Sequence, residues 1–428
     1  MLKFLISFVT VILSIFAPFN AVKAPVEDKT DFVPVIRFAA VSDSHLSVAG
    51  DNKTQRIQKF ISMSYDIAAQ DENYKNLDAV IFAGDLTDGG HKPQFMGFLS
   101  SVNSVIDYDE TALLTVMANS HDGYCRENDT FNFFEELSGQ EKDFHKVING
   151  FHFIGLSASK VKGEQYTEAQ REWLKEQLAE AVKDDPSKPV FVTHHEHVYE
   201  TVYGGREIDG WGTDFFKDIF EEYPQVVHIS GHSHYPLNDP RSIWQGEFTA
   251  IGTGSLNYAE FTVDGESRIH PDGYKKMAQM WIIEVDANNT VRLRGYDALG
   301  GALLCEYYVN NPADAANRQY TPEKQEAACS APTFPDGAEL KIKKIAGKYK
   351  ITAPAAEGSK NNPVFLYRFY VLDKDGNEVS SSYVINTYWL DDDYEKVTEK
   401  VKAEKGYTIK AAAENAYGKQ SEVLEYTV

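Results

Sequence analysis

Residues 226–234 read Val-Val-His-Ile-Ser-Gly-His-Ser-His, an apolar run that ends in a glycine and two histidines one residue apart. The apolar run predicts a buried strand, and Gly231 would let the backbone turn sharply where the strand ends. His232 and His234 would then project together from the turn, as metal ligands do. A histidine pair at this spacing is by itself more often an ordinary hydrogen-bonded surface feature. The choice therefore depends on the rest of the chain.

Four earlier segments repeat the arrangement. The apolar stretches 35–41, 77–83, 112–117 and 189–193 are predicted strands, and each runs into a short loop of aspartate, asparagine or histidine. Helices are predicted at 54–69, 93–106 and 215–222, and one more begins at the capping box of Thr167 and Gln170. Further strands are predicted at 151–156, 248–253, 280–285 and 291–296. Alternating strands and helices followed by consecutive strands predict a layered α/β fold with mixed sheets.

The loops after the strands carry the residues that could do chemistry. In a layered α/β fold these loops meet at the carboxyl ends of the strands. Two neighbouring metal ions need a bridging carboxylate and several nitrogen and oxygen ligands. The candidate ligands are Asp43, His45 and His234 for one ion, Asn119, His194 and His232 for the other, and Asp85 as the bridge. Each loop alone is weak support, but five loops in order favour a metal site.

The ordered loops resemble the motifs of the calcineurin-like metallophosphoesterase superfamily over residues 35–296. The matching motifs are Asp-x-His at 43–45, Gly-Asp-x-x-Asp at 84–88, the loop at 118–122, the histidine at 194 and Gly-His-x-His at 231–234. The resemblance implies a four-layer sandwich of two mixed sheets flanked by helices, and two divalent or trivalent ions (Fe, Zn or Mn). It implies that Asp85 is shared between the ions and that a hydroxide bridging them attacks phosphorus. His121 would bind the phosphate or protonate the leaving group, and Asp122 would orient His121.

Two departures from the family pattern leave alternatives open. The family has Gly-Asn-His-Asp where this chain has Ala118-Asn119-Ser120-His121-Asp122, so either Ser120 is inserted or it takes the ligand position. An amide oxygen is the better ligand, which favours Asn119. Glu196 stands where the family usually has proline, and this leaves His194 or His195 as the ligand. His194 is preferred because it follows the strand directly.

Composition bounds the cellular setting. The chain has 428 residues, a length that predicts two domains. Its formal charge of −22 disfavours a nucleic-acid polymer as partner. Residues 1–24 combine Lys3, an apolar run and small residues before position 24, as a secretory leader does. We therefore expect a secreted or extracytoplasmic protein with no membrane span after leader removal. Export permits a disulfide, and Cys305 and Cys329 are the nearest pair, with Cys125 left over.

The C-terminal part has a different character. Residues 33–309 would form the catalytic domain and 310–336, rich in Asn, Pro, Ala and Gln, a linker. Residues 337–428 have short alternating strands and a Lys374-Asp375-Gly376-Asn377 turn, and they resemble a fibronectin type III or immunoglobulin-like sandwich with Tyr407 as the corner tyrosine. Such a module more often spaces or binds than catalyses, so a glycan or protein contact is expected there.

The sequence predicts an exported dinuclear-metal hydrolase acting on a small phosphate ester. Whether the substrate is a phosphodiester or a phosphomonoester stays open at this point, as does the identity of the metals. The alternative is a catalytically weakened, surface-binding protein, which the altered loop at 118–122 suggests.

Overall fold

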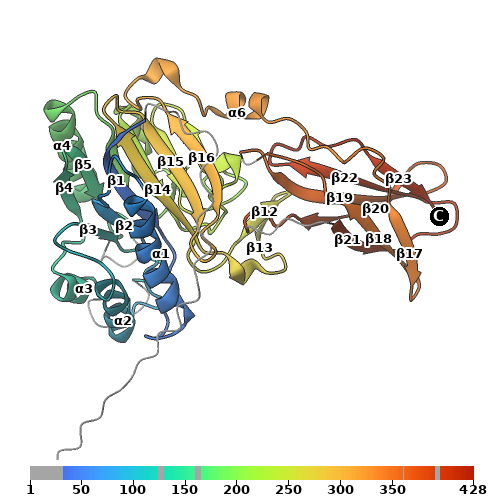
Figure 1. Cartoon of the computed structure of the whole chain (residues 1–428), viewed down its shortest axis with the longest axis horizontal. Coiled ribbons are helices and arrows are strands. Elements are labelled where there is room, and N and C mark those ends of the chain that lie inside the picture. The colour runs from blue at the N-terminus through green and yellow to red at the C-terminus, as the bar shows by residue number, and fades with distance from the viewer. Residues whose placement is uncertain (1–31, 124–129, 160–164, 360, 391–395) are drawn as a thin grey trace, which may run out of the picture.

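The computed structural model describes residues 32–123, 130–159, 165–359, 361–390 and 396–428. The predicted leader and Cys125 lie outside these residues. The larger, N-terminal part of the molecule contains two six-stranded mixed sheets (Figure 1). In spatial order the first sheet consists of β16 (Leu303–Val309), β15 (Val291–Asp297), β14 (Gln279–Asp286), β1 (Pro34–Val41), β2 (Ala79–Ala83) and β3 (Ala112–Val116).

The second sheet has the strand of residues 226–230 near its centre. Its strands, in spatial order, are β10 (Ile243–Gln245), β11 (Thr249–Gly252), β9 (Val226–Ser230), β6 (Val190–Thr193), β5 (Phe151–Gly155) and β4 (Phe144–Ile148). β5, β6, β9 and β11 run parallel, as β1, β2 and β3 do in the first sheet. Parallel strands bring their carboxyl ends to one edge, which is where the polar loops follow.

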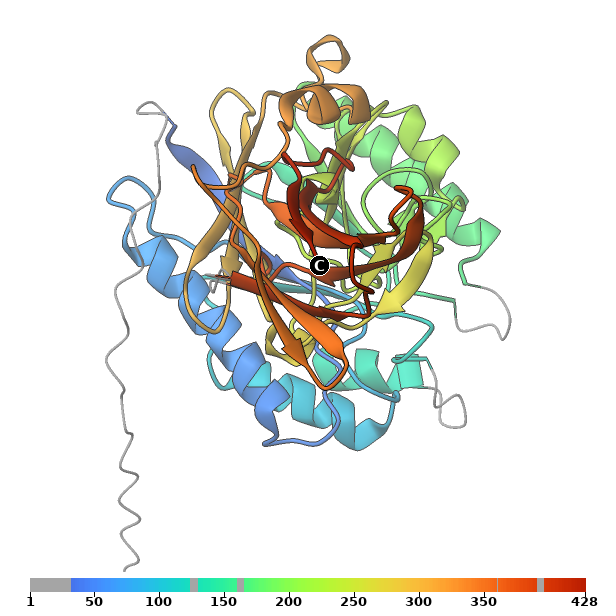
Figure 2. The ribbon, with the colours of Figure 1, turned by 90° about the vertical axis from the view of Figure 1, so that its right-hand side faces the viewer.

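Helices cover the outer face of each sheet. One face carries α1 (Asn52–Ala69), α2 (Lys92–Asn103) and α3 (Thr130–Ser138), and the other carries α4 (Glu168–Asp184) and α5 (Lys217–Glu221). The two groups appear on opposite sides of the molecule in Figure 2. A third apolar core lies between the sheets. The predicted four-layer arrangement is confirmed, and so is the capping box in which Thr167 accepts from the Gln170 amide.

A buried cluster of three arginines and one glutamate ties the first sheet together. Arg37 Nε lies 2.6 Å from Glu284 Oε1, Arg292 Nε lies 2.7 Å from Oε2, and Arg294 Nη2 lies 2.9 Å from Oε1. Burial opposes ionisation of this carboxyl, but the three guanidinium charges prevail and lower the pKa of Glu284 to about 2. The cluster therefore depends on the charge of one glutamate.

The segment predicted as a linker has structure of its own. It contains a short 3₁₀ turn at Ala315–Asn317 and helix α6 (Pro322–Ala328), which Thr321 caps by accepting from the Lys324 amide. The Gln325 amide group donates to two backbone oxygens of the N-terminal part. Residues 310–336 are thus a strap packed on the domain.

The expected disulfide between Cys305 and Cys329 is wrong. The two residues form no disulfide with each other, and both are buried. Cys305 lies on β16 in the core between the sheets, whereas Cys329 ends α6. The two cysteines are the nearest pair in the sequence, but they lie in different parts of the fold, so no disulfide forms between them.

The C-terminal part contains only strands among its described residues. One sheet consists of β17 (Lys341–Ile345), β18 (Lys348–Pro354) and β21 (Lys396–Val401), and the other of β20 (Glu378–Ile385), β19 (Val364–Leu372), β22 (Thr408–Asn415) and β23 (Leu424–Thr427). All pairs are antiparallel, and one apolar core joins the two sheets. The predicted turn at 374–377 connects β19 to β20. The likeness to a fibronectin type III domain stays a prediction.

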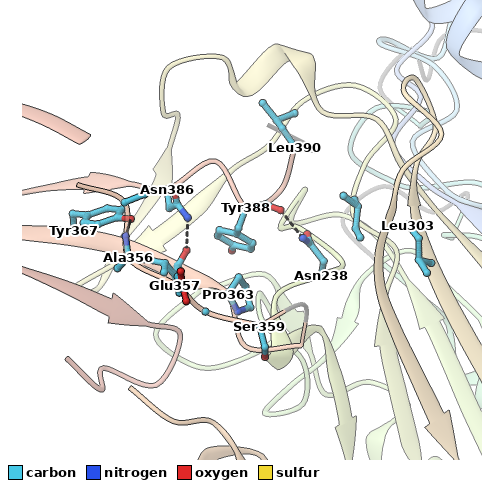
Figure 3. A pocket seen from close by; sticks show the side chains of 14 residues that line it. Asn238, Leu303, Ala356, Glu357, Ser359, Pro363, Tyr367, Asn386, Tyr388 and Leu390 are labelled. Atoms are coloured by element: carbon cyan, nitrogen blue, oxygen red, sulfur yellow. Dashed lines mark hydrogen bonds between the residues drawn. The ribbon is translucent and has the colours of Figure 1, made fainter. Parts of the chain in front are cut away.

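The two parts of the molecule share an apolar interface. Phe261 and Met277 of the N-terminal part pack with Phe365 and Trp389 of the C-terminal part. The junction leaves a cavity of about 660 Å³ (Figure 3), across which the Asn238 amide donates to the Tyr388 carbonyl oxygen at 2.7 Å. No helix within the described ranges is both long and apolar enough to cross a membrane.

Candidate metal centre

Six polar side chains gather where β1, β2, β6 and β9 end. They are Asp43, His45, Asp85, His195, His232 and His234. Backbone hydrogen bonds tie the loops to one another. The Asp43 amide donates to the Gly84 carbonyl at 3.0 Å, and the Gly231 amide donates to the His195 carbonyl at 2.9 Å. The main chain therefore joins the four loops in two pairs, and the bond from the His232 amide to the Asp43 carboxylate connects one pair to the other.

The first group of donors contains Asp43, His45, Asp85 and His234, whose ligand atoms all lie within 4.8 Å of one another. His45 Nε2 and His234 Nε2 are 3.0 Å apart, and His234 Nε2 is also 3.0 Å from Asp43 Oδ1. All four side chains are buried. The other oxygen of Asp43 accepts from the Ser42 hydroxyl and, at 3.1 Å, from the His232 amide, which fixes the carboxylate.

The second group contains Asp85, His195 and His232. His195 Nε2 lies 3.3 Å from Asp85 Oδ2 and 3.1 Å from His232 Nδ1. On the other side of its ring, Nδ1 lies 2.7 Å from the Ala83 carbonyl oxygen. Because a carbonyl only accepts, Nδ1 carries the proton, and the lone pair of Nε2 in the neutral ring faces the group. Asp85 belongs to both groups, as a bridging ligand would.

The backbone at the cluster is strained. Five of the six residues have positive φ: Asp43 (55°), His45 (45°), Asp85 (48°), His232 (73°) and His234 (58°). Non-glycine residues avoid this region, and such conformations concentrate at functional sites. Close packing also requires glycine at two positions beside the cluster. A Cβ at Gly84 would lie 2.4 Å from His195 Nδ1, and one at Gly231 would lie 2.6 Å from Asp43 Oδ2.

The sequence-based choice of His194 over His195 is wrong. His194 points to the opposite face of the second sheet, where its ring packs against Phe220 and lies 4.1 Å from the ring of His228. Both ring nitrogens of His194 are buried without a hydrogen-bond partner. Strand alternation explains the placement, because Val190 and Val192 of β6 also face the helices. Counting that alternation past the strand end would have selected His195.

The loop at 118–122 brings Ser120 to the shared carboxylate. The Ser120 hydroxyl lies 3.1 and 3.3 Å from the two oxygens of Asp85. The Asn119 side-chain oxygen lies beside Gly123, 3.4 Å from where a Cβ would stand there. The preference for Asn119 as a ligand stays a prediction.

His121 lies at the mouth of the cluster, with 40% of its side chain exposed. Its Nε2 is 4.0 Å from Asp85 Oδ2, and its Nδ1 is 3.0 Å from the Asp88 carbonyl oxygen. His45, Asp88 and His121 form a third group of potential ligands, and Asp88 is not among the ligands predicted from the sequence. Asp88 and His121 are 33 positions apart in the sequence, so their contact has no local signature.

Asp122 does not have the predicted role of orienting His121. Its carboxylate accepts hydrogen bonds from the backbone amides of Leu86, Thr87 and Ala118 at 2.9 to 3.1 Å. Burial and the nearby charge of Asp85 raise the pKa of Asp122 to about 6. The residue thus locks the loop after β2 to the loop after β3, and the Asp88 carbonyl holds His121 instead.

The electrostatics of the cluster favour a cation. Burial disfavours imidazolium, but the charges of Asp85 and Asp43 outweigh it and hold the pKa of His195 well above its usual value. The same balance between burial and Asp43 raises the pKa of His234. Burial and His195 lower the pKa of His232 to about 4. The two buried carboxylates therefore draw positive charge to the space between the rings.

The donor set fits divalent ions of the transition series. Asp43 Oδ1 is buried without a hydrogen bond of good geometry, although a histidine nitrogen lies 3.0 Å away. Two pairs of imidazole nitrogens face each other at 3.0 and 3.1 Å. Lone pairs that converge in this way are satisfied by a shared cation, and imidazole with carboxylate suits Zn, Fe and Mn.

Comparison with known proteins points in the same direction. Residues 36–236 match a family model described as calcineurin-like phosphoesterase. A stretch of 170 residues is 28% identical to a probable cyclic nucleotide phosphodiesterase of Rhodococcus erythropolis, covering 37% of this chain and 51% of that protein. A stretch of 206 residues is 27% identical to a probable glycerophosphodiester phosphodiesterase of Arcobacter nitrofigilis, covering 45% of this chain and 70% of that protein.

The chain spans about half the length of the first of these relatives. Among solved structures, a purple acid phosphatase from yellow lupin seeds has a TM-score of 0.45 and 12% identity, over 64% of this chain and 53% of that one. This likeness is too low to bear on function.

Proposed function

Residues 36–236 match the family model described as calcineurin-like phosphoesterase, and we propose that the protein is an exported hydrolase of phosphoric esters that works with two metal ions. The observation that carries the proposal is the sharing of Asp85 by two groups of buried ligands. Asp43, His45, Asp85 and His234 would hold one ion. Asp85, His195 and His232 would hold the other, together with Asn119 or Ser120.

The bound ions would lower the pKa of a water molecule and neutralise charge on the phosphoryl oxygens. The residues of the chain do the rest. Asp122 and the backbone bonds between loops keep the ligands in place, so little reorganisation accompanies substrate binding. Exposure of His121 allows it to reach a substrate above the cluster.

His121 is suited to protonate the leaving oxygen. The Asp88 carbonyl accepts from Nδ1 in both charge states of the ring, which leaves Nε2 to carry and release the proton that is transferred. Loss of this proton donor slows esters with poor leaving groups most, because good leaving groups depart without protonation.

Both curated relatives are named as phosphodiesterases, and this favours a phosphodiester over a phosphomonoester as the substrate. The predicted leader, residues 1–24, supports export.

A colorimetric assay tests the proposal. The chelator-stripped protein is assayed with bis- and mono-p-nitrophenyl phosphate after addition of Mn²⁺ or Zn²⁺, beside an Asp85→Asn control that lacks the carboxylate shared by both ligand groups. We expect metal-dependent turnover, faster on the diester. Turnover no higher than that of the control, with either metal, contradicts the proposal. Fewer than two ions per chain, together with tight binding to a glycan or protein, would favour the surface-binding alternative.

A further inference from the structure

A two-stranded hairpin stands beside the candidate metal centre. It consists of β12 (Phe261–Val263) and β13 (Glu266–Ile269), and it lies between the two parts of the molecule in Figure 1. Phe261 pairs with Ile269 and Val263 with Glu266, so β13 has one residue more than β12 over this span. The extra residue makes a β-bulge, and Arg268 within it has a φ of 61°. Bulges next to active sites change the direction of a side chain.

The bulge places Arg268 over Trp211. The guanidinium carbon lies 4.9 Å from the centre of the indole ring. That ring in turn lies 5.1 Å from the ring of His232, and its Nε1 donates to the Tyr235 hydroxyl at 3.2 Å. Arg268 is therefore within about 10 Å of a residue of the second ligand group, because the two separations set an upper limit. Arg268 is exposed and Trp211 is half-buried, so both are accessible to a ligand.

The C-terminal part holds the hairpin in place. Arg368 of β19 forms two hydrogen bonds with Asp264, at 2.8 and 2.7 Å, in the turn between β12 and β13. The same guanidinium bonds Glu414 at 2.6 and 3.0 Å. Phe261 and Val263 are buried in the interface cluster with Phe365 and Trp389. The bulge is thus fixed by residues more than a hundred positions away in the sequence.

The guanidinium N–H groups of Arg268 are available to a ligand. Within the described part of the chain no carboxylate forms an ion pair with Arg268. Stacking on an indole leaves the N–H groups in the guanidinium plane free, and these match the two oxygens of a carboxylate or phosphate. A free arginine is conspicuous on a chain with a formal charge of −22, and it would attract an anion locally.

We propose that Arg268, stacked on Trp211, binds a second anionic group of the substrate. The preferred substrates are phosphate esters whose other substituent carries a carboxylate or a second phosphate that can reach Arg268, whose guanidinium lies at most about 10 Å from the His232 ring. The proposal rests on the proposed phosphoesterase function. Arg268 would distinguish anionic from neutral esters, which the metal centre alone does not do. Because Arg368 of the C-terminal part holds the hairpin that carries Arg268, the C-terminal part would contribute to substrate choice.

The test compares 4-carboxybutyl p-nitrophenyl phosphate with its neutral carboxamide, which has the same scissile bond. Wild type, Arg268→Gln and Arg268→Lys are assayed with metals bound. Lys344→Gln is the matched control, since its ammonium lies 5.3 Å over the Tyr349 ring, far from the site. We expect wild type and the control to prefer the acid about tenfold in kcat/KM at low salt. Arg268→Gln is expected to have no preference and to keep the rate on the amide within about twofold, while Arg268→Lys is intermediate.

Equilibrium binding separates this proposal from the proposed function. The ligands are the acid and amide forms of the matching p-nitrobenzylphosphonate, in which a methylene replaces the scissile oxygen, and calorimetry measures their affinity for the metal-loaded protein. Tighter binding of the acid that Arg268→Gln abolishes supports the anion site even if no ester is turned over. Equal affinities in wild type, no measurable binding of either ligand, or equal losses for acid and amide in Arg268→Gln overturn it.

Discussion

The single substitutions His194→Leu and His195→Leu, at adjacent positions, should differ in their effect on metal binding. In His195→Leu the second ligand group loses the nitrogen that lies 3.3 Å from Asp85 and 3.1 Å from His232. One imidazole and a shared carboxylate remain from that group. Changes to residues that merely orient a ligand weaken metal binding about 10- to 100-fold. Loss of the ligand itself should weaken the second ion at least about 100-fold, or about 3 kcal/mol.

His194→Leu removes two buried ring nitrogens that have no hydrogen-bond partner. Burial lowers the pKa of His194 to about 4, so the ring is neutral at pH 7 and loses no charge interaction when replaced. Unpaired buried polar atoms cost about 1–3 kcal/mol. The variant should therefore be as stable as wild type or more so, and should retain both ions.

The assay is a titration of chelator-stripped protein with Mn²⁺, followed by elemental analysis of the protein at fixed free metal. Wild type and His194→Leu should bind two ions per chain, and His195→Leu one. Loss of an ion from His194→Leu, with both ions retained in His195→Leu, would refute the reasoning from strand alternation.

Three further predictions concern the surroundings of the cluster. Gly84→Ala should displace His195, because the new Cβ would lie 2.4 Å from the His195 ring and residue 84 has a φ of 90°. Metal titration should show weaker binding of the second ion, and thermal melts should show a loss of about 1–2 kcal/mol in the free energy of unfolding. Unchanged metal affinity together with unchanged stability would contradict this packing. His121→Gln should lower kcat by about 10²–10⁴-fold for esters of poor leaving groups and much less for p-nitrophenyl esters, so an equal loss across a leaving-group series would argue against proton donation. Glu284 has a folded pKa of about 2 against 4.5 unfolded, so its contribution of about 3 kcal/mol is present above pH 4.5 and is lost as the pH falls through 2. Glu284→Gln should lower the free energy of unfolding in urea by a similar amount at pH 7 and flatten the acid dependence, and a wild-type slope in the variant would assign that dependence to other groups.

Much of the catalytic part could be predicted because its signals are local. The strands that carry ligands are short apolar runs that end at glycine or polar loops, and β1, β2, β3, β6 and β9 all lie within a few residues of their predicted positions. Helix α4 begins where its capping box predicts. Order along the chain was then enough to gather five of the six cluster residues.

The errors at the site came from the ends of strands. At His194 the first residue after the strand was taken as the one that turns inward, but the alternation of β6 continues through it and sends His195 to the cluster. The role of Asp122 in orienting His121 was implied only by the resemblance to the family motifs. The hydrogen bonds of Asp122 run instead to the loop after β2, which only the parallel pairing of β2 and β3 brings close.

The remaining features depend on contacts between distant segments. The hairpin of β12 and β13 is short, polar on one strand and fixed by Arg368, so its own sequence gives little indication of it. The strap at 310–336 was read as a linker because a seven-residue helix has too few turns to show periodicity. The contact of Arg268 with the Trp211 ring joins strand β13 to a distant loop, and no local pattern connects the two.

The central claim is that two ions share Asp85. Diffraction from crystals soaked in Mn²⁺, measured at a wavelength where manganese scatters anomalously, tests it most directly. We expect two anomalous peaks on either side of the Asp85 carboxylate, one bounded by His45 and His234 and the other by His195 and His232. A single peak, no peak, or a peak beside His194 and His228 would contradict it.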